Sequence, residues 1–175
     1  MQQIVAFYKT PAGQKLMKQQ PVVIDGIMKN MLTSAEKSLL PMLKDAGEVI
    51  ITGSGDAFGS NHFRNLIKRL TASDDYKDLK IHLHTNGQLF DERAWRDLNL
   101  SGHVGAVQIS IDAAEADTYA NVRRPGNFER LLKNLAFLKR MRDEGQIQHL
   151  MFSMVVQDAN YREMPAFVKM GQDFS

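Results

Sequence analysis

Cysteine is absent from the 175-residue sequence. Without thiols the chain can form no disulfide bond and can supply no thiolate to zinc or to an iron–sulfur cluster. An excess of charge of one sign is also lacking, because 22 basic and 20 acidic residues leave a formal net charge of only +2. So small an imbalance does not indicate a strongly charged partner, and we expect neither nucleic acid nor membrane as partners.

Long hydrophobic runs are also missing. No apolar run approaches the roughly 20 residues of a membrane-spanning helix. The segment Met1–Lys9 lacks the basic region and long apolar core of a signal peptide, so we expect a cytoplasmic location. Hydrophobic residues nevertheless make up 43% of the chain. A chain of this length that folds compactly buries roughly 70% of its unfolded surface, which predicts a substantial core.

The first 37 residues are predicted to form a helical N-terminal segment. Apolar residues recur at helical spacing over residues 2–32, and Pro11 and Pro21 interrupt the pattern. Within it the run FYKTPAGQKL, residues 7–16, resembles the signature of a helical bacterial domain family of unknown function. That resemblance covers about residues 2–32 and implies only a helical fold.

Four short strands are predicted further along, each with a helical pattern after it. The clearest helix starts with Asn127 as its cap and ends near Gly145. Asp91 and Asn160 are the expected caps of two other helices. Alternating strands and helices predict βαβ units and a parallel sheet. The predicted strands are Val49–Ile51, Lys80–Gly87, Ala106–Asp112 and His149–Val156.

The predicted strands are polar on one face and apolar on the other. His82 and His84 share the polar face of the second strand, and Gln108 shares that of the third with Ser110. A parallel sheet covered on both faces is normally apolar on both. We therefore predict an α/β fold over residues 38–175, a partial (β/α) barrel of about four parallel strands around a polar interior. A metal site at the two histidines is conceivable, but no third ligand is clear, and packed polar residues are the favoured interpretation.

Several strand ends resemble the radical S-adenosylmethionine (radical SAM) enzymes, over about residues 38–175. The resemblance rests on a glycine-rich turn after the first strand, a Thr-Asn-Gly after the second, a Ser-Ile-Asp in the third and an Arg-Arg-Pro-Gly that follows. It implies that the turn binds the methionine amino group, that Ser110 and Asp112 contact the ribose, and that Arg124 holds the carboxylate. The other residues implied are Gly53, Ser54, Gly55 and Asp56 in the turn, Asn86, and Met154 and Val156 beside the adenine.

The sequence departs from this family at the cluster. Its members hold a four-iron cluster with the motif CxxxCxxC after a first strand, and residues 1–37 contain neither the cysteines nor such a strand. We also expect a sixth strand to be missing. The favoured interpretation is a catalytically incompetent fragment or recombined protein, with at most weak S-adenosylmethionine or nucleotide binding and no iron–sulfur cluster.

Two alternatives stay open at this point. The chain can serve as a non-enzymatic interaction module, such as an inhibitor or an antitoxin-like protein, with the partial barrel as its scaffold. Open sheet edges would then pair with a protein partner or with a second copy. The other alternative is that a separate chain supplies the cluster-binding strand.

Overall fold

The computed structural model describes residues 40–52 and 56–174. The chain divides into two units, Met1–Met42 and Leu43–Ser175, and the second unit contains the sheet. The helical prediction for residues 2–32 lies outside the described residues.

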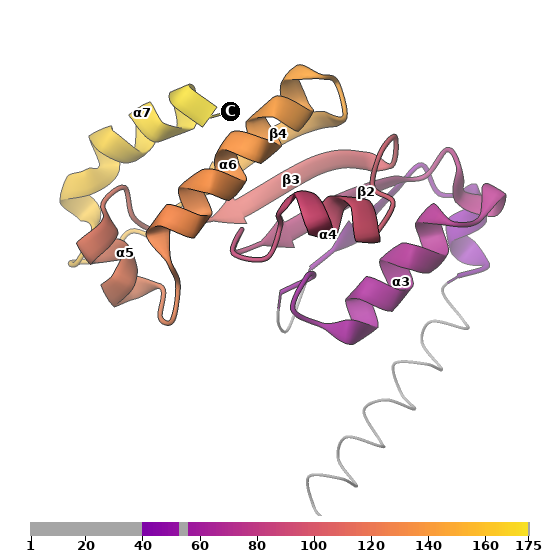
Figure 1. The fold of residues 1–175 in the computed structure, drawn as a ribbon, viewed down its shortest axis with the longest axis horizontal. Coiled ribbons are helices and arrows are strands. Elements are labelled where there is room, and N and C mark those ends of the chain that lie inside the picture. Colours follow the sequence, from indigo (N-terminus) through magenta and orange to yellow (C-terminus); the bar gives the residue numbers. More distant parts are fainter. Residues whose placement is uncertain (1–39, 53–55, 175) are drawn as a thin grey trace, which may run out of the picture. The chain divides into compact units, whose positions relative to one another are not determined.

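Four parallel strands form one sheet, in the same order in space as in the sequence (Figure 1). All four predicted strands are present, with ends shifted by a few residues. This arrangement confirms the predicted α/β fold and is consistent with a partial (β/α) barrel. The strands are β1 (Glu48–Ile51), β2 (Lys80–Thr85), β3 (Val104–Ser110) and β4 (Ile147–Ser153).

Helices connect the strands, and two of them begin where the sequence predicts. The Asp91 side chain accepts a hydrogen bond from the Ala94 amide, and that of Asn127 accepts one from the Arg130 amide. These bonds satisfy amides that a helix start leaves without a partner. The α-helices are α3 (Asn61–Thr71), α4 (Glu92–Asp97), α5 (Ala116–Val122), α6 (Phe128–Asp143) and α7 (Met164–Phe174). Short 3-10 turns are η1 (Met42–Asp45), η2 (Asp74–Tyr76) and η3 (Tyr161–Glu163).

The two faces of the sheet differ as predicted. Along β2, buried residues alternate with half-buried ones, so that Leu83 is buried while His82 and His84 are partly exposed. In Figure 1, α3, α4 and α6 lie on one face of the strands. That face is apolar because β-strand side chains alternate between the two sides and the helices cover only the apolar set.

The predicted helix start at Asn160 is correct in position, but the expected side-chain cap does not form. The turn η3 precedes α7, and the Asn160 side chain makes no capping bond. Its amide group donates to the backbone oxygens of Asp112 and Val155, at 2.8 Å each, while its oxygen accepts from the Gln157 amide. Asn160 is 1% exposed, and burial of its polar side chain is compensated by these bonds to backbone groups.

Candidate functional site

A polar hollow of about 390 Å³ lies at the carboxyl ends of the strands. Parallel α/β sheets place ligands at this edge because all strand ends and their following loops converge there. Three residues of the sequence-based prediction, Asp56, Asn86 and Ser110, line it together. The full lining is Thr52, Asp56, His84, Thr85, Asn86, Ser110 and Arg123.

Asp56 is the acidic residue among those that line the hollow, and hydrogen bonds from other residues of the protein hold its carboxylate in place. One carboxylate oxygen accepts a 2.9 Å bond from the Phe58 amide. The other accepts 2.7 Å bonds from the Thr85 hydroxyl and from the Asn86 amide. A carboxylate has about four acceptor positions, so the anchored group retains capacity for a ligand donor.

Arg123 is a lining residue that the sequence-based prediction did not include. Its guanidinium forms a 2.6 Å ion pair with Asp112, and both side chains are largely buried. Its Nε atom is buried without a hydrogen-bond partner. The predicted carboxylate ligand was the adjacent residue, Arg124, whose exposed side chain donates to Asn121. Both arginines line a neighbouring pocket of about 380 Å³ that also includes Asn86.

Asp112 connects the end of β3 to the segment after β4. Its backbone is in the left-handed region, with φ at 63°, and its carboxylate accepts a 2.7 Å bond from the Val155 amide as well as the Arg123 pair. The Ser110 hydroxyl lies 3.2 Å from that of Ser153. In the described structure Ser110 lines the hollow, whereas both Asp112 oxygens are already engaged.

The remaining predicted binding residues lie beyond β4 or outside the described chain. Met154 directly follows the last residue of β4 and is half-buried, and Val156, two residues further on, is 53% exposed. Gly53, Ser54 and Gly55 lie outside the described residues. Their roles stay predictions.

The loop after β2 is held to α5 and α6 by side-chain bonds. The Gln88 amide group donates to the Tyr119 hydroxyl and to the Asn127 carbonyl, at 2.9 Å each. Asn134, which is 4% exposed, donates to the Gly87 carbonyl at 2.8 Å. Burial raises the pKa of Tyr119, so this phenol stays a neutral partner. These bonds fix Asn86 at the rim of the hollow.

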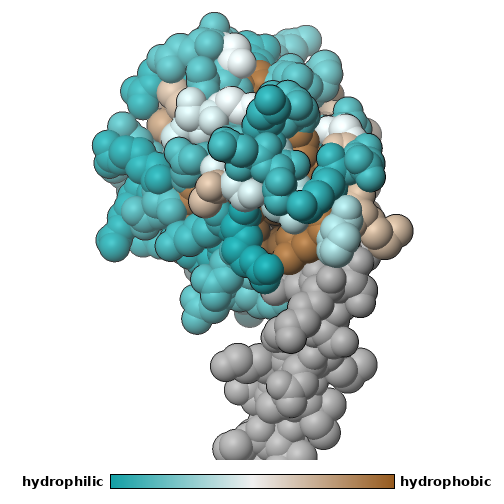
Figure 2. Space-filling model, turned by 90° about the vertical axis from the view of Figure 1, so that its right-hand side faces the viewer, coloured by the Kyte–Doolittle hydropathy of each residue, from teal (hydrophilic) through white to brown (hydrophobic). Residues whose placement is uncertain are grey.

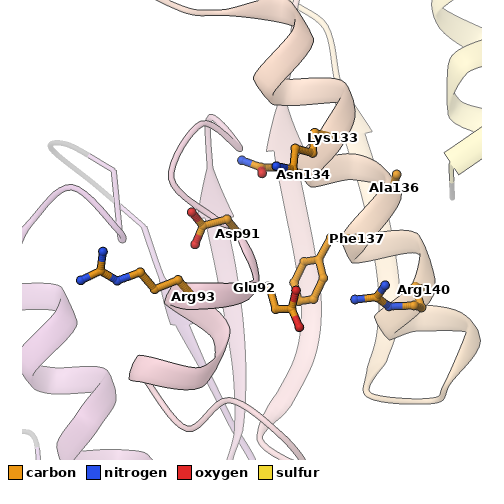
Figure 3. Close-up of a pocket in the computed structure, with 8 residues that line it drawn as sticks. All are labelled: Asp91, Glu92, Arg93, Lys133, Asn134, Ala136, Phe137 and Arg140. Carbon is orange, nitrogen blue, oxygen red and sulfur yellow. The ribbon is translucent and has the colours of Figure 1, made fainter.

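A second hollow of about 390 Å³ lies on the helical side, between α4 and α6 (Figure 3). Most of its charged groups are already used within their own helices. Asp91 caps α4, Glu92 pairs with Arg96, and the Arg140 guanidinium lies 5.4 Å from the Phe137 ring centre. It is therefore a weaker candidate than the hollow at the strand ends.

Within residues 40–52 and 56–174, no group of three or more His, Asp or Glu side chains is arranged to hold a metal ion. The same residues contain no helix that is both long and apolar enough to cross a membrane.

Comparison with known protein families gives two matches. Residues 1–41 match a family described as an uncharacterized protein conserved in bacteria (DUF2059). Residues 29–170 match the radical SAM superfamily. No curated protein matches the chain significantly. The first match confirms the resemblance of the N-terminal segment. The second match covers most of the chain, includes every strand of the sheet and confirms the other resemblance. The chain belongs to the radical SAM superfamily.

Proposed function

We propose that the strand-end hollow binds S-adenosylmethionine weakly, without radical chemistry. Charge balance is the observation that supports this ligand. Among the described residues no basic side chain forms an ion pair with Asp56, whereas the charge of Arg123 is balanced by Asp112. Among the described residues that line the hollow, Asp56 therefore contributes a negative charge without a basic partner. S-adenosylmethionine carries an ammonium and a sulfonium against one carboxylate, so its net charge is positive and complementary.

The cofactor cluster of the family does not fit this chain. Intact radical SAM enzymes hold their iron–sulfur cluster through cysteine thiolates, and this sequence contains no cysteine. We therefore assign the chain no redox step. Binding by Asp56, Asn86 and Ser110 is the activity proposed for the barrel itself.

Calorimetric titration of S-adenosylmethionine into the full chain tests the binding proposal. Asp56→Asn keeps the size of the side chain and removes its charge. We expect this substitution to weaken S-adenosylmethionine about tenfold, the factor that corresponds to about 1.4 kcal/mol. S-adenosylhomocysteine, which lacks the sulfonium charge, is expected to bind the unchanged protein more weakly. Absence of saturable binding to the unchanged protein would refute the proposal.

The proposed role of Arg124 has a separate test. Arg124→Gln removes the guanidinium that is proposed to hold the methionine carboxylate. It is expected to weaken S-adenosylmethionine but not adenosine, because adenosine has no carboxylate. Arg123→Gln is the matched comparison. An equal loss for both ligands on Arg124→Gln would count against a carboxylate contact.

The absence of radical chemistry is tested by anaerobic reconstitution with iron and sulfide. The expected result is no stoichiometric iron after desalting and no 5′-deoxyadenosine from S-adenosylmethionine under reducing conditions. A stoichiometric cluster on this chain alone would overturn the proposal. A cluster that forms only when a second protein is added would instead favour a partner that supplies the ligands.

A non-enzymatic interaction role is the second candidate function. The observation that favours it is the outer edge of β4, which no other described strand pairs with and which lies next to exposed apolar side chains. Pairing through this edge would not depend on ligand binding in the hollow.

A further inference from the structure

The outer edge of β4 is open in the described part of the chain. β4 is the last strand of the sheet and pairs only with β3. The Ser153 carbonyl accepts a 3.0 Å bond from the Ile111 amide, so the backbone groups of Ser153 point toward β3. Backbone groups alternate in direction along a strand. Those of Gln148, Leu150 and Phe152 therefore point outward, and none of them bonds to another described group.

Within residues 40–52 and 56–174, this edge lacks the devices that normally prevent pairing. Exposed edge strands are usually protected by charged side chains, by proline or by a covering element. The stretch from Ile147 to Gln157 contains no Asp, Glu, Lys, Arg or Pro. His149 is its single titratable residue, and Met151 is 46% exposed. The edge thus resembles an interior strand in composition.

An apolar stripe follows this edge along the chain. Tyr161, Met164 and Val168 are 44%, 47% and 59% exposed and are spaced for one side of a helix. The Asn160 bond to the Val155 carbonyl holds the start of this stripe against the end of the β4 segment. The side of the molecule seen in Figure 2, where α3 lies, is in contrast mostly hydrophilic.

We propose that β4 pairs antiparallel with β4 of a second copy of this chain, around a two-fold axis. The outward backbone amides and carbonyls belong to Gln148, Leu150 and Phe152, and Leu150 is the middle residue of the three. A two-fold axis at Leu150 places this residue opposite its counterpart. The same axis places Gln148 opposite Phe152 of the other copy. Every outward amide and carbonyl of these residues then has a partner. His149 lies opposite Met151 on the polar face.

Self-complementarity is the reason to choose a second copy as the occupant. A two-fold interface places each surface patch against its own duplicate. A charged edge would then meet like charges, which disfavours the pair. Because this edge is uncharged, it meets a compatible surface in its duplicate. The continuous sheet also satisfies the hydrogen bonds that an edge strand leaves open.

Oligomeric state is the first measurement, made by sedimentation equilibrium on the full chain over a range of concentrations. A monomer–dimer equilibrium is expected. Gln148→Pro removes one outward amide from an exposed position without removing a bond to β3, and it is expected to shift the dissociation constant by at least tenfold. Val168→Lys places a charge on the stripe and is expected to act in the same direction. Ile50→Lys, at a position 59% exposed on β1 at the opposite end of the sheet, is the control and is expected to leave the equilibrium unchanged.

Engineered cysteines give a test of register that does not depend on the stability of a proline variant. The natural chain has no thiol, so His149→Cys and Met151→Cys each introduce a single one. An equimolar mixture of the two variants is expected to form a disulfide-linked dimer under mild oxidation. Each variant alone is expected to cross-link far less, because identical positions are not opposite each other in this register.

Three results would overturn the proposal. The first is a protein that stays monomeric at all concentrations. The second is a dimer that both Gln148→Pro and Val168→Lys leave intact. The third is equal cross-linking of the mixture and of each variant alone. Recovery of the chain as a tight complex with a different polypeptide on this edge would also replace the second copy as the occupant.

Discussion

The Thr85 hydroxyl donates a 2.7 Å hydrogen bond to the Asp56 carboxylate, across 29 residues of sequence. The bond joins the loop after β1 to the end of β2, and Thr85 is only 5% exposed. Asp56 thus has a structural role as well as a proposed binding role. Removing its carboxylate is expected to destabilise the fold even without ligand.

Asp56→Ala is predicted to lower the free energy of unfolding by about 3 kcal/mol, since bonds to a charged acceptor are lost and buried donors stay unpaired. Urea denaturation measures the change. Combining it with Thr85→Val in a double-mutant cycle isolates the bond between the two side chains, with a coupling of about 1–2 kcal/mol expected. If the two single substitutions change the free energy of unfolding in a strictly additive way, the hydrogen bond between Thr85 and Asp56 is contradicted.

Asn134→Leu is predicted to cost about 1–3 kcal/mol, because the Gly87 carbonyl loses its buried donor while the size of the side chain is kept. The neighbouring residue provides the control. Lys133 is exposed on the same helix, and Lys133→Ala is expected to change stability by less than about 0.5 kcal/mol. Similar losses for both variants in thermal or urea unfolding would argue against the role given to Asn134.

Two glycines with nearly the same φ angle allow strain and packing to be separated. Gly87 has φ at 75° and Gly102 at 79°. A Cβ atom at Gly87 would lie 2.8 Å from the Leu131 side chain, whereas at Gly102 it would meet nothing within 4 Å. Gly102→Ala is expected to cost about 1 kcal/mol from the left-handed backbone alone. Gly87→Ala adds an overpacking cost of about 1–3 kcal/mol, and equal losses in urea unfolding would refute this difference.

His103 predicts a dependence of stability on pH. Burial, and then the nearby charge of Lys80, lower the pKa of His103 below its ordinary 6.5. The unfolded chain therefore binds a proton more readily than the folded one, and stability falls as the pH drops below about 6.5. His103→Gln is expected to reduce the loss of unfolding free energy between pH 7.5 and pH 5.5. Lys80→Gln is expected to reduce it less, and a steeper loss in His103→Gln would show that the sign is wrong.

The sheet could be predicted from sequence because its signals are local. Alternation of polar and apolar residues in β2, and caps such as Asp91 and Asn127, depend on neighbours within a few positions. The predicted polar face also follows from alternation. Asp56, Asn86 and Ser110, which the family resemblance suggested, line one hollow, and their binding roles stay predictions.

The details of the site could not be predicted in the same way. Choosing between Arg123 and Arg124 requires the direction of each side chain at the end of α5, and the sequence pattern does not give that direction. Asn160 matched a helix cap by type and position, but the Asp112 carbonyl, 48 residues away, is its partner instead. Contacts between residues so far apart in the sequence depend on how the strands are aligned with one another in the sheet.

The agreement between strand order and chain order has a consequence for synthesis. Each new strand adds to the edge left by the strand before it, so that no finished pair must open to admit a later one. The N-terminal part of a chain leaves the ribosome first, and here most strand contacts join successive units, which shortens the loops to be closed. During translation β1, β2 and β3 would each in turn form a temporary edge, and each is covered within the next βα unit.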